Sequence, residues 1–275
     1  MRNVGRKLAF VLASSNHGTM IVNRFDYRMM GPDQGFGVGH QILESGNFDP
    51  LEVELALQLL ETRRRFHGDG AVAIDCGANI GVHTIEWATA MTGWGSVIAL
   101  EAQERIYYAL AGNIAINNCF NAIAMNAAVS SENGVMKIPV PDYMTPASFG
   151  SLELRPHPNT EFIGQAINYA EEATVPVQKL ALDTLQLPRV DLIKIDIEGM
   201  ELEALEGASE TIARCRPILL VEQIKSDRER MRAWLSGRGY ELADAGLNVL
   251  AVHASDPTLG ELHASVRRPA QSSAA

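Results

Sequence analysis

The chain has 275 residues, of which 47% are hydrophobic and 20% are charged, so it is long enough to bury one large α/β core. Its formal net charge of -10 argues against nucleic acid or an anionic membrane surface as the main partner. No segment reaches the length of a membrane span, and the three cysteines lack metal-ligand or disulfide spacing, so we expect a cytoplasmic protein.

Residues 1–68 are expected to form a small α+β appendage. Short β-type runs at Lys7–Leu12 and Met20–Val22 come first. The Asp-Pro-Leu-Glu segment at 49–52 then has the arrangement of a capping box and predicts a helix that ends near Phe66. This appendage has two roles open to it: closing a pocket or building the surface of a homo-oligomer.

Residues 69–255 alternate between strand and helix patterns, which predicts a doubly wound, mostly parallel sheet of seven strands. Only a few residues separate the last two strands, too few for a crossover helix, so these strands should form an antiparallel hairpin. The tail at 256–275 is expected to be loosely ordered. Strands are expected at 71–75, 96–101, 122–129, 191–196, 217–222, 239–243 and 247–253, and helices at 81–92, 103–118, 199–214 and 226–236.

An insertion at 130–180 interrupts this alternation before the fourth strand. It contains six prolines and a Ser-Phe-Gly-Ser loop at 148–151. A long irregular insertion near the carboxyl ends of the strands is more often a functional lid than a passive connection. We therefore expect it to border the site.

The first chemical motif follows the first parallel strand. An apolar run ends at Asp75 and turns into a helix through Gly-Ala-Asn-Ile-Gly at 77–81, and the next strand ends at Glu101. Glycines let the backbone approach a ligand, and Glu101 is placed to accept hydrogen bonds from a ribose diol. The turn lacks two glycines of the dinucleotide fingerprint, and an acid before the first glycine suits a cationic amino acid group. The pattern therefore predicts an S-adenosylmethionine site.

Neighbouring groups complete the expected cofactor site. Asn126 and Ala127 follow the third strand, where the adenine should lie, and His83 lies in the first turn of the helix. His83 is equally well explained as a local hydrogen-bonding residue. The expected cofactor contacts are Asp75, Gly77, Ala78, Asn79, Gly81, His83, Glu101, Ala102, Gln103, Asn126, Ala127 and Asp196.

A second motif lies at the end of the fourth strand. Lys194, Asp196 and Glu198 are spaced two residues apart, so they share one face if the strand continues that far. Unpaired buried charge is costly, which makes such a set unusual for a core. The alternative is an ion-pair cluster that holds the junction between strand and helix.

These motifs together resemble the FkbM-type methyltransferase family. The resemblance implies a class I methyltransferase fold and S-adenosylmethionine-dependent transfer, generally to an oxygen of a sugar, polyketide or other metabolite. One departure is Ala102-Gln103, where the family commonly has a proline. The resemblance is carried by Asp75–Gly81, Glu101, Leu192–Gly199 with Glu201, Gly207-Ala208, and Pro217–Glu222.

The expected catalytic residues are Asp196, Glu222 and Lys194. Asp196 should act as the general base for an alcohol acceptor. Glu222 ends the neighbouring strand, about 4.8 Å away, so the two carboxylates can either share a hydrogen bond or bind Mg²⁺. Gln223 would be a weak third ligand, so we expect no metal and keep Asp196 and Glu222 as candidate ligands.

Three alternatives stay open at this point. A nicotinamide-dependent oxidoreductase shares the strand, glycine turn and acid layout. A non-catalytic cofactor-binding module would keep the fold without the chemistry. Methylation of nucleic acid is opposed by the acidic balance, and no flipped-base motif follows the fourth strand. The expected partner is a small-molecule or glycan acceptor.

Overall fold

A computed structural model describes residues 8–31 and 34–267 of the chain. Its strands are β1 (Phe10–Ser15), β2 (Gly18–Asn23), β3 (Arg28–Gly31), β4 (Gln34–Phe36), β5 (Ala71–Cys76), β6 (Gly95–Glu101), β7 (Ala122–Val129), β8 (Gly134–Pro139), β9 (Thr174–Leu180), β10 (Leu192–Ile195), β11 (Ile218–Glu222), β12 (Tyr240–Ala245) and β13 (Asn248–His253). Its α-helices are α1 (Val38–Ser45), α2 (Pro50–His67), α3 (Val82–Ala90), α4 (Glu104–Ile116), α5 (Glu201–Glu206), α6 (Ser209–Cys215), α7 (Arg228–Ser236) and α8 (Thr258–Arg267). Within the described ranges, no helix has the length and apolar character needed to cross a membrane.

The central sheet has the order β12-β13-β11-β10-β5-β6-β7-β9-β8. Neighbours from β11 to β9 pair in parallel, and β13 pairs antiparallel with both β11 and β12. The expected mostly parallel sheet with a terminal hairpin is therefore present. The carboxyl ends of β5, β6, β10 and β11 meet at one edge because these strands run in the same direction.

The sheet has nine strands where seven were expected. The two additional strands, β8 and β9, come from the insertion at 130–180, which was expected to be irregular. Pro176 lies within β9 and obscured its strand pattern. This proline is tolerated because β7 pairs only with residues 178–180, so one edge of β9 is free at Pro176.

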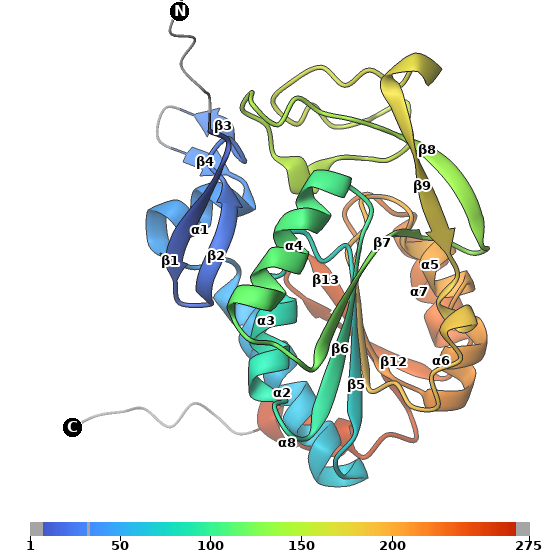
Figure 1. Ribbon diagram of the computed structural model, residues 1–275. Coiled ribbons are helices and arrows are strands. Elements are labelled where there is room, and N and C mark those ends of the chain that lie inside the picture. The colour runs from blue at the N-terminus through green and yellow to red at the C-terminus, as the bar shows by residue number, and fades with distance from the viewer. Residues whose placement is uncertain (1–7, 32–33, 268–275) are drawn as a thin grey trace, which may run out of the picture.

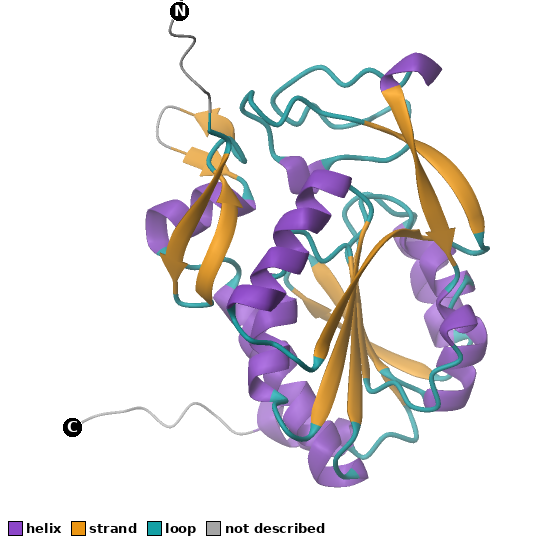
Figure 2. Ribbon diagram, viewed as in Figure 1, coloured by secondary structure: helices purple, strands orange, loops and turns teal. Residues whose placement is uncertain are grey.

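Helices cover both faces of the sheet (Figures 1 and 2). Helices α2, α3, α4 and α8 lie on the left of the view in Figure 1, and α5, α6 and α7 lie on the right. The core on the first face joins Leu59, Trp87 and Val97 in one buried cluster. On the second face, Ile193 and Leu205 belong to another. This two-sided burial explains the nearly continuous apolar runs of the central strands.

The N-terminal strands pack against the same core. The β1–β2 hairpin lies beside α4, where Asn113 Oδ1 accepts a hydrogen bond from the Ile21 amide at 2.5 Å. Met20 and Val22 belong to the buried cluster that contains Trp87. The first β-type run was expected to start at Lys7, which lies outside the described residues.

Three local expectations about helices were wrong. The capping box at 49–52 does not form, because Asp49 takes a left-handed conformation (φ 39°) and makes no side-chain cap. The helix expected at 199–214 is broken into α5 and α6 at Gly207, where a Cβ would lie 2.1 Å from the Ser130 carbonyl oxygen. In the tail, residues 258–267 form α8, although we expected loose order there.

Candidate active site

A cavity opens at the carboxyl ends of β5, β6, β10 and β11. Helix α2 and the insertion loop at 148–154 supply further parts of its wall. Gly81, Asn126 and Lys194 were also expected at the site, but they do not line this cavity. The expected site residues that line it are Asp75, Gly77, Ala78, Asn79, His83, Glu101, Ala102, Gln103, Ala127, Asp196 and Glu222.

The glycine turn after β5 depends on the absence of side chains. Gly77 has a φ of +80°, and a Cβ there would lie 1.8 Å from the carbonyl oxygen of Asp196. The Gly77 and Ala78 amides both donate to the Leu100 carbonyl at 2.9 Å. The turn is thus clamped between the ends of β6 and β10, and its backbone lines the cavity.

Glu101 links the glycine turn to the start of α4. One carboxylate oxygen accepts from the Asn79 amide at 3.0 Å and the other from the Gln103 amide at 2.8 Å. Burial raises the pKa of Glu101 to about 7, although these two hydrogen bonds lower it. Each oxygen keeps a second lone pair, so the carboxylate can still accept two hydroxyl groups of a ligand.

Three residues near this edge have structural roles. Thr84 Oγ1 donates to Asp75 Oδ2 at 2.6 Å and fixes that buried carboxylate. Gly81 is the cap residue of α3, at a φ of 93°. The Asn126 side chain donates to the Glu101 carbonyl at 2.8 Å and so stabilises the end of β6 from outside the cavity.

The insertion contacts the edge of the cavity through Gln103. Its side-chain amide donates to the Phe149 carbonyl at 2.9 Å, and Tyr143 donates to its oxygen at 3.1 Å. The buried Asp26 carboxylate accepts from the amides of Phe149 and Gly39, at 2.9 and 3.0 Å. One buried acid of the N-terminal segment therefore holds both the insertion loop and α1.

Lys194 and Asp196 form an ion pair of 2.8 Å at the end of β10. Lys194 also lies 3.5 Å from Glu52 of α2, whose other oxygen accepts from Asn248 at 2.6 Å. Burial would lower the pKa of Lys194, but the carboxylates of Asp196, Glu52 and Asp75 outweigh it and raise that pKa. The expected alternative, an ion-pair cluster at the strand end, therefore describes Lys194 well.

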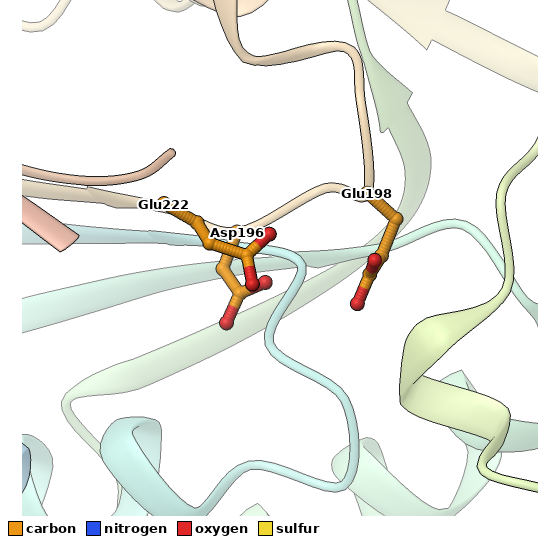
Figure 3. Close-up of side chains that lie close together, drawn as sticks. All are labelled: Asp196, Glu198 and Glu222. Atoms are coloured by element: carbon orange, nitrogen blue, oxygen red, sulfur yellow. The ribbon is translucent and has the colours of Figure 1, made fainter. Parts of the chain in front are cut away.

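Glu198 and Glu222 bring two more carboxylates beside Asp196 (Figure 3). One oxygen of each of the three lies within 4.8 Å of the others. Strand β10 ends before Glu198, which reaches the cluster from a left-handed turn (φ 58°). Burial and the Asp196 charge raise the pKa of Glu198 to about 8, and the same two causes with Glu198 raise that of Glu222 to about 9.

The cavity residues that were missed in the sequence include Asp49, Glu52 and Asn248. Asp49 and Glu52 matched a capping box, which gave their carboxylates a local role. Burial would raise the pKa of Glu52, but Lys194, His83 and Asn248 lower it to about 2. The sequence offered no signal for this role, because the capping-box spacing accounted for both acids and Lys194 lies far away in the chain.

The arrangement provides an acid-lined cavity with two chemical ends. At one end, the glycine turn and Glu101 can hold a ligand with hydroxyl groups and a positive charge. At the other end, Asp196 can accept a proton while Lys194 stabilises its charged form. These are the requirements for binding a cationic cofactor and activating a hydroxyl group beside it.

Comparison with known proteins points to methyl transfer. The sequence model described as "Methyltransferase FkbM domain" matches residues 75–242. "Methyltransferase sdnD" of Sordaria araneosa is 25% identical over 195 residues, which cover 62% of this chain and 73% of that protein.

Two solved structures are also similar. Methyltransferase FkbM from Methylobacillus flagellatus KT has 18% identity and a TM-score of 0.47, over 67% of this chain but only 44% of that one. Precorrin-6y C5,15-methyltransferase from Geobacter metallireducens GS-15 has 15% identity and a TM-score of 0.43, over 76% and 89% of the two chains.

Proposed function

Because this chain belongs to the FkbM methyltransferase family, we propose that it transfers a methyl group from S-adenosylmethionine to a hydroxyl oxygen of a small-molecule or glycan acceptor. The observation that carries the proposal is one cavity lined by both Glu101 and Asp196. The family match at 75–242 makes the nicotinamide-dependent oxidoreductase the weaker alternative.

The residues present suit this cofactor. Glu101 offers each ribose hydroxyl an acceptor oxygen, and the side-chain-free Gly77 leaves the turn's backbone open to the methionine portion. The carboxylate of Asp75 lies beside this turn and favours a positive charge. Asn79 and Val82 stand where the second and third glycines of the dinucleotide fingerprint belong, which disfavours the close approach of a pyrophosphate.

Asp196 is the proposed general base. When bound, S-adenosylmethionine supplies an electrophilic methyl group. The acceptor oxygen forms the new bond to carbon, the electron pair of the broken C–S bond stays with sulfur, and Asp196 takes the hydroxyl proton. Lys194 holds Asp196 Oδ2 at 2.8 Å, which leaves Oδ1 for this proton. Glu222, on the neighbouring strand, orients the acceptor.

The three carboxylates fit Mg²⁺ poorly, although their spacing allows a cation. Lys194 lies 2.8 Å from Asp196, and Lys225 lies 2.5 Å from Glu198. Two of the three candidate ligands are therefore already neutralised by ammonium groups, which would also repel a divalent ion. We propose a metal-independent transfer.

Calorimetric titration with S-adenosylhomocysteine and, separately, NADH tests the cofactor. Binding of the first alone is the expected result; binding of NADH alone would favour the oxidoreductase. The variant Asp196→Asn tests the chemistry: S-adenosylhomocysteine affinity should stay within a few fold of wild type while methyl transfer falls. Methyl transfer by Asp196→Asn at the wild-type rate would reject Asp196 as the base. Cofactor binding by the wild-type protein without any methyl transfer would favour a non-catalytic module.

The remaining expectations belong to the same proposal. We also propose a cytoplasmic location and a homo-oligomeric assembly. The net charge of -10 supports an acceptor other than nucleic acid. Size-exclusion chromatography with light scattering measures the assembly directly.

A further inference from the structure

The cavity is strongly acidic, and this bears on the acceptor. Among its described lining residues none is Lys or Arg, and His83 is the one imidazole. The carboxylates that line it are Asp49, Glu52, Asp75, Glu101, Asp196, Glu198 and Glu222. A phosphate or carboxylate group on the acceptor would therefore be repelled.

Most of these carboxylates have partners inside the protein. Asp196 and Glu52 share Lys194, and Glu198 has Lys225. Asp75 and Glu101 line the end of the cavity that is proposed to bind the cofactor. Asp75 accepts a hydrogen bond from Thr84, and Glu101 accepts hydrogen bonds from two backbone amides. These acids do not require an acceptor group for compensation.

Glu222 and Asp49 have no such compensation. Glu222 Oε2 is buried and has no hydrogen-bond partner among the described residues. Asp49 makes no side-chain cap at α2, and burial together with the charges of Glu52 and Asp196 raises its pKa, although His83 and Lys194 act in the opposite direction. Both acids line the same cavity, and a positive charge placed there would lower their raised pKa values and favour their ionised forms.

The distance between the Asp196 and Glu222 carboxylates indicates which kind of cationic group would fit there. Oxygens of Asp196 and Glu222 lie within 4.8 Å of each other, at the ends of paired strands. A hydroxyl group and an ammonium group on neighbouring carbons can reach both oxygens at once. An ammonium group needs only one free carboxylate, whereas Mg²⁺ would need those already held by lysines.

Resting on the proposed methyl transfer, we propose that the acceptor is a vicinal amino alcohol, such as an amino sugar or an aminocyclitol, whose ammonium group binds Glu222 while Asp196 deprotonates the neighbouring hydroxyl. Asp49 adds long-range attraction from the N-terminal end of α2. Neutral analogues lose the charge-assisted hydrogen bond, and anionic analogues meet uncompensated acids.

Binding to the protein saturated with S-adenosylhomocysteine tests this class. The probes are D-glucosamine, N-acetyl-D-glucosamine, D-glucose and D-glucose 6-phosphate, titrated calorimetrically at millimolar concentrations. Glucosamine should bind at least about tenfold more tightly than its neutral analogues, as expected for one charge-assisted hydrogen bond. Equal affinities, preference for a neutral or anionic probe, or no saturable binding of glucosamine would each overturn the inference.

Two variants locate the preference. Glu222→Gln should remove the tenfold advantage of glucosamine, whereas Glu229→Gln, an exposed acid of α7 outside the cavity, should keep it. Retention of the advantage in Glu222→Gln would overturn the assignment to Glu222. Failure of S-adenosylhomocysteine to bind would instead reject the proposed function, so the two failures are distinct.

Discussion

Substitution of Glu101 by glutamine should weaken S-adenosylhomocysteine binding and remove its pH dependence. The two carboxylate oxygens already accept the Asn79 and Gln103 amides, at 3.0 and 2.8 Å. In Glu101→Gln the new NH₂ group faces one of these amide donors and cannot accept a ribose hydroxyl. Loss of one hydrogen bond to a charged group costs about 1.5–3 kcal/mol, or roughly a 10- to 150-fold rise in Kd.

The pH dependence follows from the same carboxyl. Burial raises the pKa of Glu101 to about 7, so below that pH the free protein holds it mostly neutral. Binding that needs the charged form must release a proton, and affinity therefore rises with pH through about 7. At about pH 6 only about one molecule in ten is ionised, which predicts roughly tenfold weaker binding than on the alkaline plateau.

Calorimetric titration at about pH 6, 7 and 8 measures this effect. The glutamine variant is the control, because any pH dependence that belongs to the ligand itself persists in it. Repeating the titration in two buffers of different ionisation enthalpy counts the protons released. A wild-type affinity that is flat over this range, or a variant with the wild-type slope, would refute the role of Glu101.

Three further perturbations test the scaffold and the metal. Gly77→Ala should abolish S-adenosylhomocysteine binding, because its Cβ would lie 1.8 Å from the Asp196 carbonyl oxygen; Gly93→Ala, also at positive φ but in open space, is the control and should bind normally. Asp191→Asn should lower the free energy of unfolding in urea by about 1–3 kcal/mol, since Arg63 keeps its ion pair with Asp256 but loses this buried carboxylate; an unchanged free energy of unfolding contradicts this. EDTA should leave methyl transfer unchanged, and activity that disappears and returns with Mg²⁺ would show that the lysines do not exclude the ion.

The central sheet was predictable because its evidence is local. Alternating strand and helix patterns after residue 69 predicted a mostly parallel sheet, and the short turn before Leu247 predicted the antiparallel hairpin. The glycine turn was equally predictable, because its glycines directly follow a strand in the sequence. The structure adds the reason for Gly77, where a side chain would collide with the backbone at the end of β10. Strand β9 was not predictable in this way, because Pro176 interrupts its pattern and its pairing with β7 and β8 is seen only in the structure.

The site was predictable where its residues follow strands, and not where they come from elsewhere. Asp196 and Glu222 end neighbouring strands, so their proximity follows from parallel pairing. Glu52 reaches the site from a helix far away in sequence, and its spacing from Asp49 suggested a local cap instead. Long-range charge pairing outweighed the local preference because Lys194 is buried and requires a counter-charge.

The contact between Glu52 and Asn248 joins the two flanks of the family segment. These two residues hydrogen-bond at 2.6 Å, yet one precedes and the other follows the segment at 75–242 that defines the family. The cavity wall is thus partly encoded in the flanks, while the glycine turn and Glu101 lie inside the family segment. Substitutions in the flanks can therefore change this part of the cavity wall while the glycine turn and Glu101 stay the same.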